Sequence, residues 1–159
     1  MGQVVEFQPN GITSLSLGDN LNNVDLIEYV KVKSDENHYL WFVDHYDYYF
    51  VNTKVCFDFG ITIDSLFIAT DKLGKIVGII IISNRNTMEI FQNLRDFYGE
   101  PSINSFSSIE KQNANKKWFW KVENRYSLIY RETGNCKRQE VLYVVSESDL
   151  HMPGVTINN

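Results

Sequence analysis

Histidine and aspartate residues crowd into one short stretch of the sequence, at His38, Asp44, His45 and Asp47, where they could support acid–base chemistry or metal binding. If His45 and Asp47 lie on one face of a strand, Asp47 can orient the imidazole ring. A zinc site needs a third or fourth ligand, and the sequence has no Cys-x-x-Cys or His-Glu-x-x-His motif to supply it. We therefore favour a polar surface bend between buried aromatic residues. The alternative is a small metal-dependent hydrolase centred on His38, His45 and Asp47.

Motifs for other kinds of catalysis are missing from the sequence. It contains no GxxxxGK or GxGxxG phosphate loop and no GxSxG nucleophile elbow. Two pairs of acids, Asp58 with Asp64 and Glu123 with Glu132, flank predicted strands and turns, and we interpret them as solvated carboxylates. We expect a protein without enzymatic activity, cofactor or bound metal ion.

The histidine-containing stretch is also unusually aromatic, reading HYLWFVDHYDYYFVN from His38 to Asn52. Its residues favour two strands with a turn or bulge at Asp44–His45. In one interpretation, one face of these strands is core and the other is a hydrated tyrosine face. In the other it is a contact surface, since Tyr offers a large area at low entropic cost and Asp can pair with a partner's Lys or Arg. The residues that we nominate for partner binding are Asp44, Tyr46, Asp47, Tyr48, Tyr49 and Asp58.

The overall composition indicates a folded, acidic protein. Hydrophobic residues make up 43% and aromatic residues 14% of the sequence, which is enough to build a core in a chain of 159 residues. The net charge of −5 disfavours nucleic acids and anionic lipids as partners but permits a basic protein, whose approach it would steer. We predict one α+β domain over residues 1–150 and a loosely ordered tail over 151–159.

The sequence does not predict export or membrane insertion. The N-terminus lacks a basic region followed by an apolar stretch, and the most apolar run, Ile76 to Ile82, is too short to cross a bilayer. Cys56 and Cys136 are far apart in the sequence and are expected to be reduced thiols. These features predict a cytoplasmic protein.

Short elements are predicted in the first part of the chain. They are a strand over residues 4–7, a turn over 9–11, an extended piece over 12–17 and a half-buried strand over 55–59, ended by Gly60. A helix is predicted from Gly18 to Glu28, because Asp19 or Asn20 can cap its free amides and apolar residues recur at helical spacing.

A β-hairpin and a helix form the best-defined part of the prediction. Two strand-like runs, residues 61–70 and 75–83, flank the loop Asp71–Gly74, whose glycine supplies a positive φ. The second run is apolar on both faces and is expected in the middle of a sheet. Asn86–Glu89 matches a capping box, so a helix is predicted from Thr87 to Tyr98, ended by Gly99.

Three strands are predicted to close the domain as an antiparallel meander, over residues 117–123, 126–132 and 137–146. Trp118 and Trp120 share one face of the first strand, and the helical stripe Ile90, Leu94 and Phe97 is their natural partner. Basic residues at 116–117 and 137–138 are expected to block unwanted strand pairing. The predicted fold class is α+β, with a twisted antiparallel sheet of hairpins and a C-terminal meander packed by two or so helices.

The order of hairpin, capped helix and Trp-rich strand is carried by the sequences DKLGKIVGIIII, FYGEP and WFW. From Ile61 to Tyr130 this order resembles small bacterial α+β proteins, among them the immunity proteins that neutralise secreted or contact-delivered toxins. It also resembles small lipoprotein-like modules of the outer-membrane assembly type. Those modules carry a signal peptide and a lipidation cysteine, and we predict neither feature from this sequence. The resemblance to immunity proteins is therefore favoured.

The resemblance to immunity proteins implies a non-enzymatic, cytoplasmic protein that binds a cognate toxin and occludes its active site or docking surface. Because such toxins are often basic nucleases, exposed acids and tyrosines would carry the binding. A sheet edge could also take up a strand of the toxin. A secretion chaperone or adaptor remains a further alternative, since it would also bind through an acidic and aromatic face.

Overall fold

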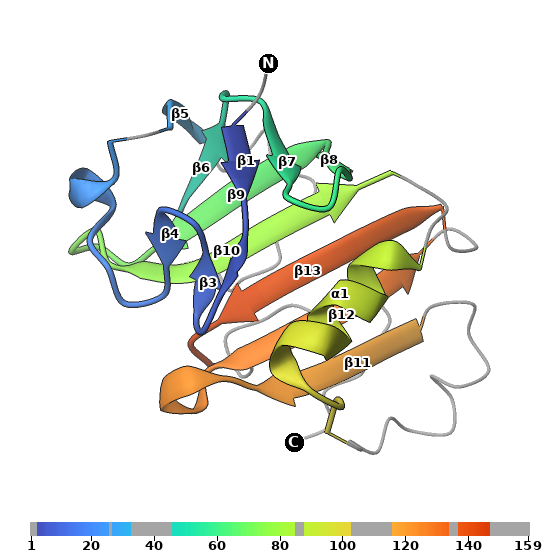
Figure 1. Ribbon diagram of the computed structural model, residues 1–159. Coiled ribbons are helices and arrows are strands. Elements are labelled where there is room, and N and C mark those ends of the chain that lie inside the picture. The colour runs from blue at the N-terminus through green and yellow to red at the C-terminus, as the bar shows by residue number, and fades with distance from the viewer. Residues whose placement is uncertain are drawn as a thin grey trace.

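A seven-stranded antiparallel sheet forms the centre of the protein (Figure 1). The computed structural model describes residues 3–25, 27–32, 46–84, 88–102, 116–133 and 137–146. The strand order is β11-β12-β13-β10-β9-β6-β5, so β11 and β5 are the edge strands of this sheet. Its strands are β5 (Tyr29–Val32), β6 (Asp47–Val51), β9 (Ser65–Thr70), β10 (Ile76–Ser83), β11 (Lys116–Lys121), β12 (Ser127–Thr133) and β13 (Arg138–Val144).

The predicted hairpin is confirmed as β9 and β10, which pair antiparallel. In the loop between them, the Asp71 carboxylate accepts hydrogen bonds from the backbone amides of Leu73 (2.9 Å) and Lys75 (3.0 Å), and Gly74 has a φ of 83°. Every residue of β10 is buried, as expected for a central strand. The first strand starts later than predicted, because Thr62–Ile63 form a separate strand, β8, in a smaller sheet.

The predicted C-terminal meander is also confirmed. Strand β11 pairs with β12, and β12 pairs with β13, both antiparallel. The 3₁₀ turn η3 (Glu123–Arg125) connects the first two strands. The meander then continues into the hairpin, because β13 pairs antiparallel with β10 and places Tyr143 opposite Ile79. One sheet therefore joins segments that are far apart in the sequence.

The helix α1 (Glu89–Tyr98) lies across the meander (Figure 1). Its buried residues are Ile90, Phe91 and Leu94. The C-terminus matches the prediction, because Gly99 has a φ of 87° and its N–H donates to Arg95 O (2.9 Å). The start differs from the prediction: the helix begins at Glu89, and the side chain of the preceding Met88 makes no capping hydrogen bond. Residues 86–87, at the predicted start of the helix and its capping box, lie outside the described residues.

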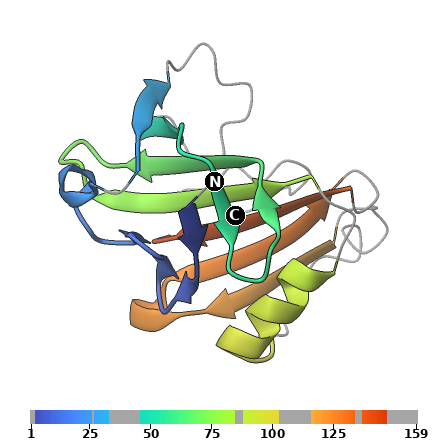
Figure 2. The ribbon, with the colours of Figure 1, turned by 45° about the horizontal axis from the view of Figure 1, so that its top comes forward.

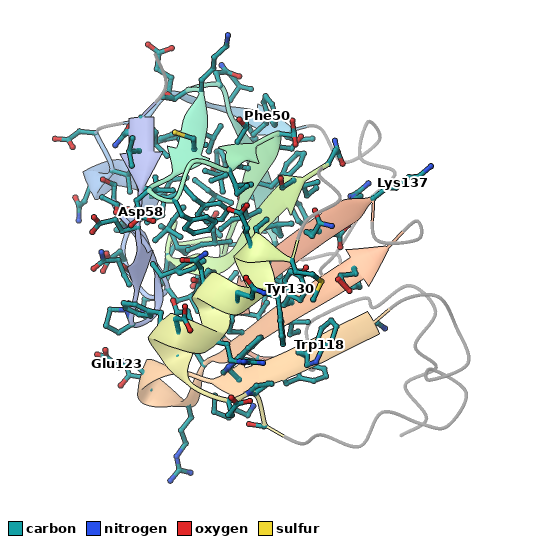
Figure 3. The ribbon with its side chains drawn as sticks, turned by 45° about the vertical axis from the view of Figure 1, so that its right-hand side comes forward. Phe50, Asp58, Trp118, Glu123, Tyr130 and Lys137 are labelled. Carbon is teal, nitrogen blue, oxygen red and sulfur yellow. The ribbon has the colours of Figure 1, made fainter. Side chains whose placement is uncertain are left out.

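The tryptophans of β11 pack under α1, as predicted, and Trp118 lies beside the helix in Figure 3. The ring of Phe91 lies 4.6 Å from that of Trp118 and 6.1 Å from that of Trp120, measured between centroids. Phe97 does not join this group. It is 51% exposed, and its ring lies 6.2 Å from that of Phe7.

The helix predicted over residues 18–28 is wrong. Leu21–Asn23 form only a 3₁₀ turn, η1, in which Asn20 accepts a backbone hydrogen bond (2.9 Å) and so acts as the predicted cap. Further along, the N–H of Glu28 donates to Thr53 Oγ1 (2.7 Å), and its carbonyl accepts from the N–H of Asn52 (2.8 Å). The N–H and C=O of Glu28 are therefore bonded to residues 52 and 53 and do not form helical hydrogen bonds. In the described part of the chain, α1 is the single α-helix.

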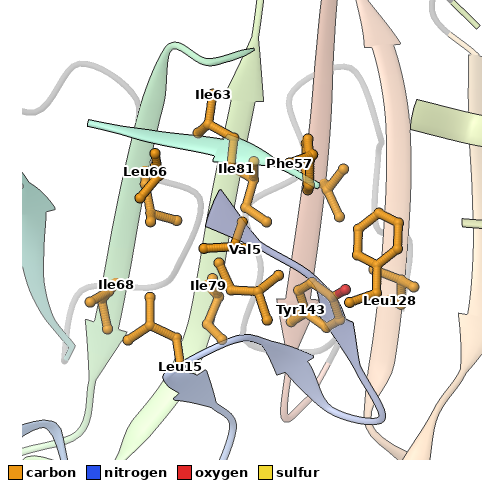
Figure 4. Close-up of a cluster of buried hydrophobic side chains, with 14 of the residues drawn as sticks. Val5, Leu15, Phe57, Ile63, Leu66, Ile68, Ile79, Ile81, Leu128 and Tyr143 are labelled. Carbon is orange, nitrogen blue, oxygen red and sulfur yellow. The ribbon is translucent and has the colours of Figure 1, made fainter. Parts of the chain in front are cut away.

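Two small sheets share one face of the large sheet with α1 (Figures 1 and 2). In the first, β1 (Gln3–Val5) runs parallel to β7 (Val55–Phe57), and β8 is antiparallel to β7. The second is a meander of β2 (Phe7–Gln8), β3 (Gly11–Ile12) and β4 (Leu15–Ser16). Figure 4 shows Val5, Leu15 and Phe57 from these sheets facing the central strands. The parallel β1–β7 pair departs from the predicted antiparallel architecture.

The opposite face of the large sheet is also apolar and buried. The buried residues of this second core are Tyr48, Ala69, Val77, Ile80, Ile82, Ile129, Leu142 and Val144. Burial on both faces confirms the prediction made from the run of isoleucines in β10. No helix in the described ranges combines the length and apolar character needed to cross a membrane. The predicted tail, residues 151–159, lies outside those ranges.

Candidate partner-binding site

The predicted contact residues on and beside β6 do not share one face of the sheet. Successive side chains of a strand point to opposite faces. Tyr48 is only 5% exposed and belongs to the second core, against which Tyr46 packs. Tyr49 packs on the first core, where its ring meets that of Tyr29 edge-on at 5.6 Å. Tyr48 therefore offers no contact surface, and Asp44 lies outside the described residues.

Asp47 already has partners within the chain. Its Oδ1 lies 3.1 Å from Lys72 Nζ and 3.5 Å from Lys31 Nζ. The hydrogen bond from Lys72 is the main cause that holds the pKa of Asp47 below its usual value, and the charge of Lys31 adds to it. Since both lysines are largely exposed, this ion pair contributes little to stability. A partner that used Asp47 would have to compete with two cations.

Asp58, the remaining nominated residue, lies apart from β6. It follows β7, and its N–H donates to Val5 O (2.9 Å), so the backbone turn is fixed against β1. The side chain is exposed, and Figure 3 places it well away from Phe50 of β6. The six nominated residues thus do not form one patch, and Asp58 belongs to a different surface.

That surface is a hollow of about 350 Å³ at the seam between α1 and the two small sheets. Three segments line it: the corner between β1 and β2, the turn after β7, and one face of α1. The lining residues are Glu6, Phe7, Asp58, Phe59, Asn93, Asp96 and Phe97. Positions 93, 96 and 97 lie three and four residues apart, so they form one stripe along the helix.

Phenyl rings form the apolar part of the hollow. The ring of Phe7, which is 7% exposed, lies 5.9 Å from that of Phe59 and 6.2 Å from that of Phe97. Phe59 is held in place because it stacks on Phe57 at 4.8 Å with an interplanar angle of 9°. The aromatic lining is therefore anchored in the core, while the ring of Phe97 remains half exposed.

Three exposed carboxylates, those of Glu6, Asp58 and Asp96, line the same hollow. Among the described residues, no lysine, arginine or histidine lies within ion-pair distance of any of them. The fourth polar residue, Asn93, donates its side-chain N–H to Glu89 O (2.8 Å). The hollow therefore presents uncompensated negative charge beside aromatic rings, which is an arrangement suited to a cation.

Of the seven lining residues, only Asp58 is nominated for partner binding from the sequence, and Phe97 is predicted in the core. The other five have no functional role in that prediction. A signal for them does exist. The sequence contains three dipeptides in which an acid precedes phenylalanine, Glu6-Phe7, Asp58-Phe59 and Asp96-Phe97, and all three line this hollow. The dipeptides come from distant segments, so only the tertiary structure brings them together.

The alternative chemistry centred on histidine is not addressed by the described residues. His38, His45 and His151 all lie outside them. Within the described ranges, no three His, Cys, Asp or Glu side chains are grouped so that they could hold a metal ion. Cys56 is a free thiol in this structure, and Cys136 is not among the described residues.

One of the acids interpreted as solvated is in fact buried. Glu132 is 1% exposed and lies 3.5 Å from the hydroxyl group of Tyr130. Nearby, Glu140 is 2% exposed and accepts a hydrogen bond from Arg131 Nε (2.8 Å). Both glutamates lie on strands of the meander. Because a buried charge is costly without hydrogen-bond or ion-pair partners, we assign these contacts to the stability of the sheet.

Comparisons of this chain with protein-family models, with curated proteins and with solved structures found no match.

Proposed function

We propose that this chain is a non-enzymatic immunity protein that binds a basic bacterial toxin and occludes its active site or docking surface. The observation that carries the proposal is the acidic, aromatic hollow between α1 and the small sheets. Its carboxylates have no cationic partner among the described residues, so a basic protein could pair with them without displacing a lysine or arginine of this chain. The resemblance of residues 61–130 to immunity proteins supplies the biological setting.

Charge and aromatic surface support this proposal in different ways. The net charge of −5 would steer a basic partner toward the protein and raise the association rate. Phe97, at 51% exposed, offers apolar area that would be buried only on binding. A small number of such anchored aromatic residues commonly provides most of the binding energy of an interface.

A neutralisation assay tests the proposal. The product of a toxin-like reading frame next to this gene would be purified, and its activity measured with increasing amounts of this protein. We expect the two proteins to copurify and the toxin activity to fall to zero at a 1:1 ratio. The variant Glu6→Gln/Asp58→Asn/Asp96→Asn should weaken neutralisation at least tenfold, because close charge pairs at interfaces contribute about 1.5 kcal/mol or more each.

A second triple variant provides the matched control. Asp19, Asp25 and Glu28 are also exposed, and none of them lines the hollow. Asp19→Asn/Asp25→Asn/Glu28→Gln changes the net charge by the same amount and should leave neutralisation nearly unchanged. If both triple variants neutralised the toxin equally poorly, the effect would come from the net charge of the protein and not from the hollow. A toxin that stayed fully active in excess protein would exclude that toxin as the partner.

A further inference from the structure

We infer that the hollow between α1 and the small sheets is a receptor for one arginine side chain of the partner protein. This inference rests on the proposed function and specifies the group that the partner must present. It follows from the three acid–phenylalanine pairs, from the hydrogen-bonding character of the lining and from the size of the hollow.

The acid–phenylalanine pairs place a carboxylate and a ring next to each other three times. Glu6-Phe7 comes from the corner of β1 and β2, Asp58-Phe59 from the turn after β7, and Asp96-Phe97 from α1. In the first two pairs, which lie at a strand corner and in a turn, neighbouring side chains diverge, so that the acid points outward while the ring lies against the core. This agrees with burial, since Glu6 and Asp58 are exposed while Phe7 is buried and Phe59 half-buried. In the helical pair, Asp96 and Phe97 are both exposed.

The polar lining consists mostly of hydrogen-bond acceptors. Ionised carboxylates accept hydrogen bonds and donate none. Asn93 uses one of its two side-chain N–H groups on Glu89 O, and its Oδ1 is a further acceptor. The complementary guest is a positively charged group that only donates hydrogen bonds, and the side chains that carry such a group throughout the neutral pH range are Arg and Lys.

Arginine fits this lining better than lysine. A guanidinium group has five N–H donors in a planar fork, which can serve several carboxylates at once, whereas an ammonium group has three donors around a point. The planar group can also stack on a phenyl ring, and Phe97 is half exposed beside Asp96. With a volume of about 350 Å³, the hollow has room for one long side chain and part of its backbone.

Binding of short peptides, followed by ¹⁵N–¹H NMR on the full chain, tests this inference. The probes are capped Gly-Arg-Gly, capped Gly-Lys-Gly, tetramethylammonium chloride and calcium chloride. We expect the arginine peptide to shift the amides around residues 6–7, 58–59 and 93–97, with a dissociation constant on the order of millimolar. The lysine peptide should bind about fivefold more weakly, because it lacks the planar fork.

Two variants separate the charges from the rings. Glu6→Gln/Asp58→Asn/Asp96→Asn should weaken binding of the arginine peptide at least tenfold. Phe97→Leu keeps apolar bulk but removes the ring, and it should weaken the arginine peptide about two- to five-fold. The lysine peptide should be weakened by a smaller factor, because an ammonium group is attracted to the ring but cannot stack on it. Met88→Leu is the control for the second variant, because Met88 is also on the exposed surface beside α1, at 45%, and does not line the hollow.

The outcomes distinguish this inference from the proposed function. Equal or tighter binding of the lysine peptide, of tetramethylammonium or of Ca²⁺ would overturn the assignment of arginine. If the arginine peptide shifted no amide around the hollow while the acidic triple variant still lost toxin neutralisation, the inference would fail and the proposed function would stand. If the peptide bound as expected but no basic toxin were neutralised, the hollow would still be an arginine receptor and the proposed function would fail.

Discussion

At the scale of single residues, Tyr98 joins two parts of the layer that covers the sheet to the sheet itself. It is the last residue of α1, and its hydroxyl group donates to Gln8 O at 2.5 Å. The hydroxyl of Tyr143 on β13 lies 2.7 Å from that of Tyr98 and can donate to it. Burial raises the pKa of both tyrosines above the usual value, so both remain protonated donors. These bonds hold α1 and the N-terminal meander, which supply four of the seven residues lining the hollow, in a fixed relation to each other.

Removing the Tyr98 hydroxyl should therefore destabilise the protein. We expect Tyr98→Phe to lower the free energy of unfolding by about 1–3 kcal/mol, because it leaves the half-buried Gln8 carbonyl and the buried Tyr143 hydroxyl without this partner. Urea denaturation followed by circular dichroism measures this change. Tyr29→Phe is the control, because the Tyr29 hydroxyl reaches its acceptor, Leu21 O, only at 3.4 Å. If Tyr29→Phe lowered the free energy of unfolding by as much, the Tyr98 hydrogen bonds would contribute no more than an ordinary weak one.

The raised pKa of Tyr98 and Tyr143 also predicts how stability depends on pH. In the unfolded chain both groups titrate near 10, whereas in the folded protein burial keeps them protonated to higher pH. Their contribution is therefore complete below about pH 10 and declines above it, since the unfolded state then binds fewer protons. We expect the urea midpoint to fall from about pH 10 upward, and to fall less steeply in Tyr143→Phe. Parallel curves for the two proteins would contradict this.

At the scale of elements, the connection between β11 and β12 contains a conformation that its residues do not favour. Asn124 and Arg125 have φ values of 61° and 62°. Asn tolerates this left-handed region, but Arg does not, because its Cβ crowds the following carbonyl oxygen. The sheet pairing on either side, with Lys121 opposite Ser127, fixes the turn all the same. The backbone at Arg125 is therefore strained.

Arg125→Gly should relieve this strain. We expect it to raise the free energy of unfolding by about 0.5–1 kcal/mol, since the relief of about 1–2 kcal/mol exceeds the added entropy of glycine in the unfolded chain. Differential scanning calorimetry would then give a higher Tm. Arg125→Ala retains the Cβ and should not give this gain. Equal stabilisation by both variants would point to the loss of the arginine side chain as the cause.

Local patterns identified some elements and misjudged others. The hairpin at Asp71–Gly74 and the end of α1 at Gly99 follow from short-range rules that need no partner. The segment after Gly18 was predicted as a helix because apolar residues recur at helical spacing there, yet the backbone of Glu28 binds residues 52 and 53. Weak helix formers such as its asparagines cannot resist that competition.

At the scale of the whole molecule, the large sheet depends on one pairing between distant segments. In the described ranges, the hairpin and the C-terminal meander are joined by the pairing of β10 with β13, and both faces of these two strands are buried. By contrast, β5 is an edge strand in which Val30 and Lys31 are exposed. Stability should therefore decrease from the centre of the sheet toward β5.

Native-state hydrogen exchange can test this gradient. We expect the amides of Ile79–Ile81 in β10 and of Val141–Tyr143 in β13 to exchange only on global unfolding, because these strands are paired on both sides and fully buried. Those of β5 should exchange at least tenfold faster, since it pairs on one side with β6. Uniform protection across the sheet would contradict the expected gradient.

The sequence by itself determined the local elements and the overall chemical character of this protein. The isoleucine run of β10, the turn at Gly74, the stripe of α1 and the alternating tryptophans depend on residues that are close in sequence, so periodicity and turn chemistry are enough. The same holds for the charge of −5, which favours a basic partner.

Only the tertiary structure decided which acids and aromatic residues meet. The alternation of β6 places Tyr46 and Tyr48 on one face and Tyr49 on the other, while Asp47 is occupied by two lysines from other segments. The three acid–phenylalanine pairs converge because β1 pairs parallel with β7 and because α1 packs beside them. Such long-range pairing follows from burial of the whole core, and no short window of sequence contains that information.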